Sequence, residues 1–225
     1  MTKGILLDLD NTLYKYDDCH NVALQELILS VNNLFGFNEI EIKSAYKKAR
    51  NKTHIDLKET ASSHNRLIYI QKMLELLDVN SIKYSLQLND LYWSIFMENM
   101  KLFDGVKKFI EKYENRICIV TDLTADIQFK KLKKLGIESK IRFMVSSEEA
   151  GKEKPHSYPF LLSLYKLKLE KEEVLMIGDN FKKDILGAYN IGIKSIWLNL
   201  KNESFNYDSD YIQEVKSFNK ILNIL

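Results

Sequence analysis

The sequence predicts an α/β protein in which a Rossmann-like parallel sheet carries an inserted α-helical domain. Two observations support this fold class. Five short apolar runs of strand length alternate with stretches of helical spacing, a pattern typical of right-handed βαβ units in a parallel sheet. Residues 15–100 differ, because they contain one glycine, Gly36, and no proline, and their apolar residues recur at helical spacing. We therefore expect an α/β core of residues 1–14 and 101–225 and a helical insert of residues 15–100.

The elements of the core are expected in alternating order. The apolar runs that we interpret as strands are residues 4–10, 116–122, 142–147, 173–179 and 194–200. The stretches that we interpret as helices are residues 106–113, 125–135, 158–167 and 184–190. Gly105 marks the return of the chain from the insert. Gly136 follows a basic run and is expected to end a helix, since glycine readily adopts the left-handed conformation found at helix C-termini.

The insert is expected to fold by packing its apolar stripes together. Such stripes at helical spacing indicate helix packing more often than a cofactor site. Tyr14 and Tyr16 lie at the entry to the insert, where a hinge is expected. The most ligand-like polar residues of the insert are His54, His64, Asn65 and Arg66. For these four, a solvated helix face or a helix N-cap is the more common explanation.

Composition and charge exclude some classes of partner. Apolar residues make up 45% and charged residues 28%, as in ordinary globular domains, so a packed core is expected. The 33 Lys and Arg residues nearly balance the 31 Asp and Glu residues, which leaves a formal charge of +2. This balance gives no reason to expect a nucleic acid or an anionic membrane as partner. A site that attracts phosphate must therefore be local.

The apolar and cysteine content indicates a cytoplasmic protein. The apolar run at residues 5–7 is too short for a signal peptide, and no stretch approaches the roughly 18 apolar residues that span a bilayer. Cys19 and Cys118 lie far apart, without metal-ligand or redox spacing, so we expect two reduced structural thiols. Nothing in the sequence indicates an oligomeric state.

Polar residues gather at the ends of the predicted strands. Ligands of doubly wound sheets bind beyond the carboxyl ends of the strands, so these residues are expected to meet at one edge. Four acidic groups, two hydroxyls and a lysine are expected to converge there: Asp8, Asp10, Asp179, Asp184, Thr12, Thr121 and Lys154. Asp122 directly follows Thr121.

This set of residue types has a chemical logic. Crowded carboxylates repel one another unless a cation lies between them, and an incomplete cage of oxygen ligands suits Mg²⁺. A carboxylate can attack phosphorus to form an aspartyl-phosphate, and a second carboxylate can protonate the leaving oxygen. A lysine and a hydroxyl can orient and neutralise the phosphoryl oxygens.

The motifs resemble those of the haloacid dehalogenase superfamily. The segment from Asp8 to Tyr14, DLDNTLY, is similar to the first signature, DxDxT, and Thr121 at the end of ICIVT is similar to the second. Lys154 with its following proline resembles the third signature, with Lys152 as a rival lysine. GDNFKKD, which contains Asp179 and Asp184, resembles the fourth. A helical cap between the first and second signatures occurs in a group of these enzymes, so the resemblance identifies residues 15–100 as a cap.

The resemblance implies a role for each matching residue. Asp8 would be the nucleophile and a metal ligand, and Asp10 would be the general acid and base and offer its backbone carbonyl to the metal. Thr12 would hold the geometry of the loop. The residues implied in binding the phosphoryl group are Thr121, Asp122 and Lys154, and those implied in binding Mg²⁺ are Asp8, Asp10, Asp179 and Asp184.

The expected activity is hydrolysis of a small phosphorylated metabolite. Asp10 argues against dehalogenation, because family members that cleave carbon–halogen bonds lack this aspartate. A phosphomutase keeps both aspartates and stays an alternative. A catalytically silent binding module would have lost Asp8, Asp10, Lys154 or Asp179, and a response-regulator domain fits the DxDxT start and the insert poorly. The insert is similar in length to the caps of phosphatases that act on sugar phosphates and nucleoside monophosphates, which are the substrate classes that we expect.

Overall fold

The structure, a computed structural model, describes residues 2–224 and divides the chain into two compact units. We call Met1–Lys15 together with Lys101–Leu225 the α/β unit, and Tyr16–Met100 the helical unit. Each unit is described by itself below.

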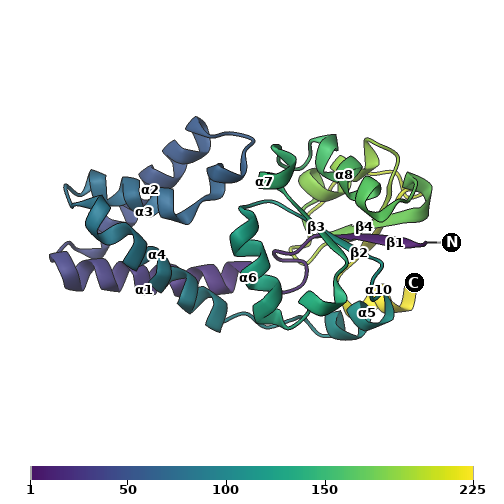
Figure 1. Ribbon diagram of the computed structural model, residues 1–225, viewed down its shortest axis with the longest axis horizontal. Helices are drawn as coiled ribbons and strands as arrows, with labels where there is room; N and C mark the ends of the chain where they lie inside the picture. Colours follow the sequence, from purple (N-terminus) through teal and green to yellow (C-terminus); the bar gives the residue numbers. More distant parts are fainter. Residues whose placement is uncertain (1, 225) are drawn as a thin grey trace. The chain divides into compact units, whose positions relative to one another are not determined.

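The α/β unit is built on one sheet of six parallel strands in the order β3-β2-β1-β4-β5-β6 (Figure 1). The strands are β1 (Gly4–Leu7), β2 (Ile117–Thr121), β3 (Phe143–Ser146), β4 (Val174–Gly178), β5 (Lys194–Leu198) and β6 (Ile212–Val215). The chain runs from β1 through β2 to β3 and then returns to the other side of β1 with β4. The strand order therefore switches between β1 and β4, which is where such sheets form their ligand crevice.

The α/β fold class predicted from the sequence is confirmed, and each of the five predicted strands is present. The sixth strand, β6, was not predicted, because Ile212–Val215 is only four residues long and has only two apolar residues. In β6 those two residues are the buried ones, and because they are three positions apart they lie on opposite faces of the strand.

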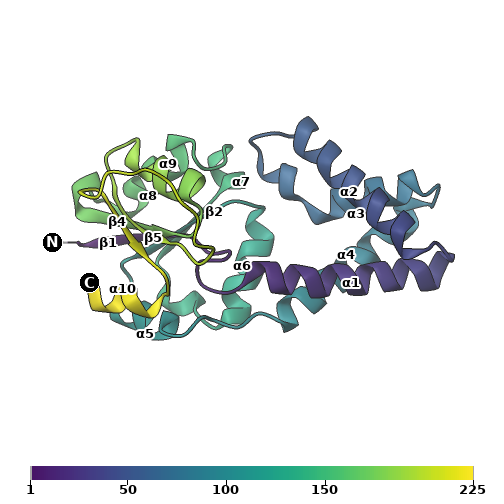
Figure 2. The same ribbon diagram turned by 180° about the vertical axis from the view of Figure 1, so that it is seen from behind.

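Helices cover both faces of the sheet. Figure 2 shows α8 and α9 over one face and α5 and α10 over the other. The helices and helical turns of this unit are α5 (Val106–Lys112), α6 (Ala125–Leu135), η2 (Glu138–Lys140), α7 (Ser147–Ala150), α8 (Ser157–Leu167), η3 (Lys171–Glu173), η4 (Phe181–Ile185), α9 (Leu186–Tyr189) and α10 (Asn219–Ile224). Leu6, Cys118 and Met176 from neighbouring strands pack with Phe160 of α8 in a core that is closed to solvent.

The glycines predicted to mark boundaries do so, whereas one predicted helix is different. Gly136 ends α6 with φ 66°, and Gly105 precedes α5 with φ 87°. The stretch 184–190, predicted as one helix, is a π-helical turn, η4, followed by the short α9. Wide turns of this kind are often found at functional sites, and η4 contains Asp184.

The helical unit consists of four α-helices and one short 3₁₀ turn. Its elements are α1 (Tyr16–Phe35), α2 (Glu39–Asp56), η1 (Ala61–His64), α3 (Arg66–Leu76) and α4 (Ser81–Glu98). Within the unit, α1 packs on α4, α4 on α3 and α3 on α2. Asparagines begin three of the helices: Asn38, Asn65 and Asn80 each accept a backbone N–H of the first turn with the side chain, which satisfies donors that the helix itself cannot.

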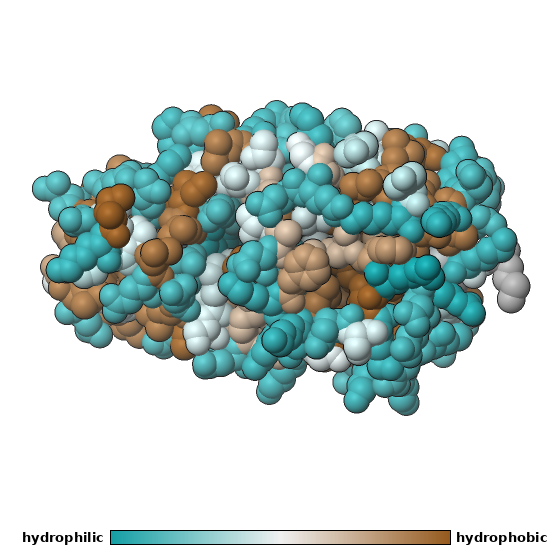
Figure 3. Space-filling view, viewed as in Figure 1, coloured by the Kyte–Doolittle hydropathy of each residue, from teal (hydrophilic) through white to brown (hydrophobic). Residues whose placement is uncertain are grey.

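The surface of the helical unit is mixed in character. Figure 3 shows hydrophobic side chains interspersed with hydrophilic ones on this face of the molecule. Ile40, Ile55 and Ile82 are at least 75% exposed. None of the helices formed by residues 2–224 combines the length and the apolar character needed to cross a bilayer. Cys19 and Cys118 are both buried free thiols, as predicted.

Candidate active site

Asp8 directly follows β1, at the carboxyl end of a central strand, and its side chain is almost fully buried. Its backbone N–H still donates to Ile177 of β4 (2.9 Å), so the position of the residue is fixed by the sheet. One carboxylate oxygen, Oδ2, accepts a hydrogen bond from the Thr12 hydroxyl at 2.7 Å. Asn11 has φ 63°, a left-handed conformation that asparagine tolerates, and this tight turn brings Thr12 back to Asp8.

Lys154 links Asp8 to Asp184. Its ammonium is 2.7 Å from Asp8 Oδ1 and 2.6 Å from Asp184 Oδ1, and it also donates to the Val120 carbonyl at 2.8 Å. These three bonds use all three N–H donors of the lysine. Since its side chain is only 3% exposed, Lys154 acts as a fixed positive charge beside the two carboxylates.

Asp179 and Asp184 follow β4, which pairs with β1 on the side opposite to β2. Carboxylate oxygens of Asp8, Asp179 and Asp184 lie within 4.8 Å of one another. Asp179 is positioned by its backbone N–H, which donates to the Thr12 hydroxyl at 3.0 Å. Asp184 approaches so closely that a Cβ on Gly178 would lie 2.5 Å from its Oδ2, so only glycine fits at that position.

The electrostatics of this cluster favour a cation. Burial raises the pKa of Asp8 to about 7, against the effect of Lys154. Burial, followed by the charges of Asp8 and Asp184, raises the pKa of Asp179 to about 8. Burial alone would lower the pKa of Lys154, but Asp184 and Asp8 raise it well above its usual value. One ammonium thus faces three carboxylates, and a divalent cation with hard oxygen ligands would balance the remainder.

Asp10 lies apart from the three clustered carboxylates. Both of its carboxylate oxygens are 2.7 Å from the ammonium of Lys131, and Oδ1 also accepts a hydrogen bond from the Tyr14 hydroxyl. Gln128 Nε2 is 3.4 Å from Oδ2. The Asp10 side chain is 23% exposed, whereas that of Lys131 is completely buried. Two side chains of α6, Lys131 and Gln128, therefore position the Asp10 carboxylate.

Thr121 and Asp122, at the end of β2, lie between these two groups. The Thr121 hydroxyl accepts a hydrogen bond from Gln128 Nε2 at 2.5 Å. Asp122 uses both carboxylate oxygens within the protein, accepting from the backbone N–H of Lys154 (3.1 Å) and from the ammonium of Lys183 (2.7 Å). Its side chain therefore orients two lysines, and because a carboxylate repels phosphate, only its backbone could serve as a direct phosphate ligand.

The structure brings all eight candidate residues to the carboxyl ends of β1, β2 and β4, and it adds residues that the sequence did not reveal. Lys131 and Gln128 were not predicted as site residues, because the basic sequence of their helix indicates a solvent-exposed surface. Their three-residue spacing, with Leu132 and Leu135 on the same face, is the signal that could have found them. Lys183 was likewise not predicted.

Known hydrolases and phosphatases are similar to this chain. A family model described as haloacid dehalogenase-like hydrolase matches residues 5–198. Ribulose-1,5-bisphosphate 5-phosphatase of Halopiger xanaduensis is 34% identical to this chain over 210 residues, covering 91% of the chain and 87% of that protein. Glyceraldehyde 3-phosphate phosphatase of Methanocaldococcus jannaschii is 25% identical over 232 residues, covering 100% and 97%.

A solved structure shares the fold. The HAD-hydrolase YfnB of Bacillus subtilis, in a crystal structure bound to magnesium, matches with a TM-score of 0.75 at 21% identity. The match covers 100% of this chain and 98% of that one.

Proposed function

The chain belongs to the haloacid dehalogenase-like hydrolases and is a phosphatase, and we propose that it hydrolyses a small phosphorylated metabolite through an aspartyl-phosphate on Asp8. The observation that carries this proposal is the environment of Asp8. Its carboxylate is buried, oriented by Lys154 and Thr12, and grouped with Asp179 and Asp184 at the switch point of the sheet.

In the first proposed step, a carboxylate oxygen of Asp8 attacks the phosphorus atom of the substrate. A bond forms between this oxygen and phosphorus, and the bond between phosphorus and the alcohol oxygen of the substrate breaks. Asp10 gives its proton to the departing oxygen. Lys154, fixed between Asp8 and Asp184, neutralises charge on the phosphoryl oxygens, and the Thr121 hydroxyl donates a hydrogen bond to one of them.

In the second step, Asp10 takes a proton from water, and the water oxygen attacks the phosphorus atom. The bond from phosphorus to the Asp8 oxygen breaks, which releases inorganic phosphate and restores the carboxylate. We assign Lys131 the role of a positioning residue, since it holds both oxygens of Asp10 while Asp10 alternates between acid and base.

Asp8, Asp179 and Asp184 are the side chains that would hold Mg²⁺, with the Asp10 carbonyl as a further ligand. When bound, Mg²⁺ would supply positive charge to the transferring phosphoryl group. The donor set fits the ion, because Mg²⁺ prefers a few carboxylate oxygens and completes its shell with water and phosphate oxygens.

The substrate class that we propose is sugar phosphates, with nucleoside monophosphates as the second group to examine. Two relatives are named for sugar or triose phosphates, and one of them matches nearly the whole chain at 34% identity. We further propose that the helical unit is the cap that selects the substrate, and that the enzyme acts in the cytoplasm.

Phosphate release from a panel of sugar phosphates, nucleoside monophosphates and p-nitrophenyl phosphate tests the proposal. We expect release with Mg²⁺ and none with EDTA. Conversion of a sugar phosphate to its isomer without release of phosphate would instead identify a mutase.

A covalent trap tests the intermediate. Enzyme mixed with ³²P-labelled substrate and quenched in acid should carry label on the peptide that contains Asp8, and hydroxylamine should remove it, because acyl phosphates react with this nucleophile. An unlabelled enzyme during rapid turnover would contradict covalent catalysis.

A further inference from the structure

Arg66, the first residue of α3, is a buried cation whose hydrogen-bond partners are all neutral. Its side chain donates from Nε to the Tyr92 hydroxyl (3.2 Å), from Nη1 to the His64 carbonyl (3.2 Å) and from Nη2 to the Tyr16 hydroxyl. The residue is 6% exposed. Within residues 2–224, no carboxylate forms an ion pair with Arg66. Of the two explanations expected from the sequence, the solvated helix face is wrong for this residue, which directly follows the N-cap residue Asn65.

Aromatic rings surround the guanidinium without neutralising it. The carbon atom Cζ lies 5.0 Å from the ring centroid of Tyr69 and 5.6 Å from that of Tyr92. Ring faces attract a cation, but this attraction compensates only part of the hydration free energy that the charge loses on burial. Burial acts to lower the pKa of Arg66, whereas the oxygens of Tyr16 and the neighbouring tyrosines raise it, so the side chain stays charged.

His20 adds no charge to this cluster. The Tyr92 hydroxyl accepts from Nε–H of Arg66 and is also hydrogen-bonded to Nδ1 of His20, 2.6 Å away. Burial, followed by the charge of Arg66, lowers the pKa of His20 to about 4, so its imidazole is neutral near pH 7.

Tyr46 of α2 supplies an independent observation. Its side chain is 4% exposed, and its hydroxyl is buried without any hydrogen-bond partner. The ring packs edge-on against Tyr69, the tyrosine beneath Arg66, with centroids 6.1 Å apart, and the hydroxyl is close enough to affect the guanidinium electrostatically. Buried hydroxyls are rarely left unbonded in native proteins, so an acceptor is expected at this position.

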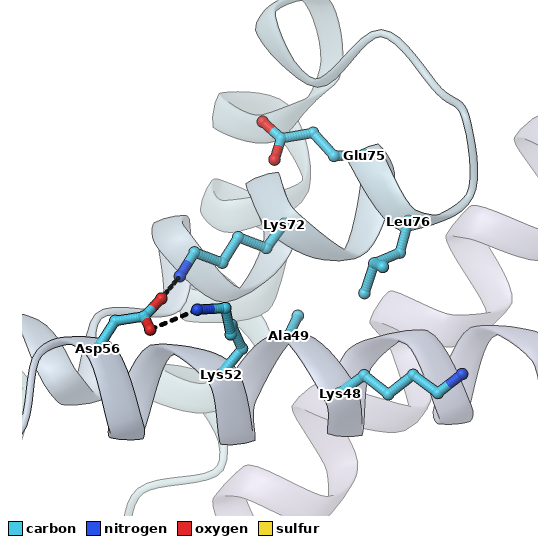
Figure 4. A pocket seen from close by; sticks show the side chains of 7 residues that line it. All are labelled: Lys48, Ala49, Lys52, Asp56, Lys72, Glu75 and Leu76. Carbon is cyan, nitrogen blue, oxygen red and sulfur yellow. Dashed lines mark hydrogen bonds and ion pairs between the residues drawn. The ribbon is translucent and has the colours of Figure 1, made fainter.

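Other cations of the helical unit are treated differently. Lys52 and Lys72 line a groove between α2 and α3, and both contact the carboxylate of Asp56, at 2.6 and 3.1 Å (Figure 4). These lysines are paired although they are partly exposed. The buried guanidinium of Arg66, which needs a counter-charge more, has none among residues 2–224.

We propose that Arg66, Tyr46, Tyr92 and Tyr16 form a binding site for an oxyanion, the phosphate or carboxylate group of a small molecule. A guanidinium has five N–H donors, and three are used within the protein, which leaves one on each terminal nitrogen for a pair of anion oxygens. The Tyr46 hydroxyl donates to the same group. The anion is either a second charged group of the substrate or a separate small anion.

The two tryptophans of the chain allow the site to be observed separately. Trp93 belongs to the helical unit and its ring centroid is 5.1 Å from that of Tyr92, whereas Trp197 donates to the Asp179 carbonyl in the α/β unit. In protein labelled with 5-fluorotryptophan, ¹⁹F NMR gives one signal for each. Titration with inorganic phosphate should shift the Trp93 signal in a saturable manner.

Tyr46→Phe is the decisive variant, because it removes an unbonded hydroxyl and nothing on which the free fold depends. We expect phosphate affinity at the Trp93 signal to fall roughly tenfold, the usual effect of losing a hydrogen bond to a charged group. Arg66→Met should lower it by about a hundredfold or more, provided that circular dichroism shows a folded protein. Lys72→Met, a cation on the same helix but paired with Asp56, is the matched control and should leave the affinity unchanged.

A Trp93 signal that phosphate does not shift, or that shifts with equal affinity in Tyr46→Phe, would overturn the proposal. A kinetic comparison then identifies the source of the anion, and only this part rests on the proposed phosphatase activity. If the anion belongs to the substrate, Tyr46→Phe should lower kcat/KM for a sugar bisphosphate about tenfold more than for p-nitrophenyl phosphate. Equal effects on both substrates, with the NMR result retained, indicate a separate anion. Absence of phosphate release from the unaltered protein would refute the phosphatase proposal and leave the NMR result valid.

Discussion

The α/β unit and the helical unit each bury a cluster of charged side chains, and the two clusters have opposite imbalance. In the α/β unit, the ammonium of Lys154 faces the carboxylates of Asp8, Asp179 and Asp184. In the helical unit, the hydrogen-bond partners of the Arg66 guanidinium among residues 2–224 are two tyrosine oxygens and a backbone carbonyl. The first cluster lacks positive charge and the second lacks negative charge.

The comparison indicates that the uncompensated charge of a buried cluster predicts the charge of its ligand. Isolated charges are costly to bury, so a fold that keeps them must gain the missing charge from outside the chain. The α/β unit is suited to a metal cation, and the helical unit to an anion. Four predictions, beginning with the largest expected effect, test this comparison.

The first prediction concerns the nucleophile. Asp8→Asn keeps the shape of the side chain but removes the attacking oxygen, so kcat should fall by about 10⁴-fold or more. Phosphate release under saturating substrate measures this, and the melting temperature shows whether the fold is intact. Asp126→Asn, an exposed aspartate paired with Lys130 in the same unit, is the control and should retain activity. Substantial turnover by Asp8→Asn would show that another group attacks phosphorus.

The second prediction compares the two buried cations. Lys154→Met leaves Asp8 and Asp184 facing each other without a counter-charge, and the free energy of unfolding should fall by about 3–5 kcal/mol. Arg66→Met orphans no opposite charge, so its loss should be less than half as large when no anion is present. Urea unfolding of both variants in EDTA and in buffer without phosphate gives the two values. Equal losses of unfolding free energy would contradict the proposed difference in charge balance between the two clusters.

The third prediction concerns Lys131, which holds Asp10. Lys131→Met should lower kcat by roughly 10–100-fold, within the range that general acid–base catalysis contributes, with little change in KM. Lys130→Met, at the exposed neighbouring position, should behave as the unaltered enzyme does. A raised KM with an unchanged kcat would contradict a role through Asp10.

The fourth prediction concerns pH and metal. The pKa of Asp8, about 7, and that of Asp179, about 8, lie above the ordinary value of 3.8, so the folded state binds more protons than the unfolded state between these limits. In EDTA, the contribution of Asp8 and Asp179 to stability should therefore be fully present below about pH 4 and be lost as pH rises towards 8. Mg²⁺ should raise the melting temperature by roughly 5 °C at pH 8 and by less at pH 5. Calorimetry measures this, and Asp179→Asn should remove most of the effect of Mg²⁺.

Much of the fold and of the candidate site could be predicted because the signals are local. Each strand that precedes a site residue is a short apolar run, and parallel strands place their carboxyl ends at one edge. Asp8, Lys154 and Asp184 therefore had to lie near one another once the βαβ order was recognised. The hydrogen bond from Thr12 to Asp8 was not itself predicted, although it is local, since the two residues lie in one tight turn.

The residues that were missed depend on contacts between distant segments. Lys130 and Lys131 are neighbours of identical type, yet the first is exposed and the second is completely buried. The two lysines differ only in the face of α6 on which they lie. Asp10, the partner of Lys131, is 121 positions away in the chain. For β6, pairing with β5 supplies the strand structure that four residues of low apolar content do not specify by themselves.

From sequence alone we could predict the order of the first five strands and of the helical stretches between them, the helical character of residues 15–100 and the carboxylates and lysine that follow the strands. These features could be predicted because periodicity and short motifs depend only on residues that are close in the sequence. Tertiary structure alone decided which charges find a partner. Arg66 reads as one more polar residue at a helix start, and it became a candidate anion site only when packing of the helices surrounded it with tyrosines and excluded every carboxylate from its contacts. Charge balance in the interior depends on which distant side chains are buried together, and that is settled by packing.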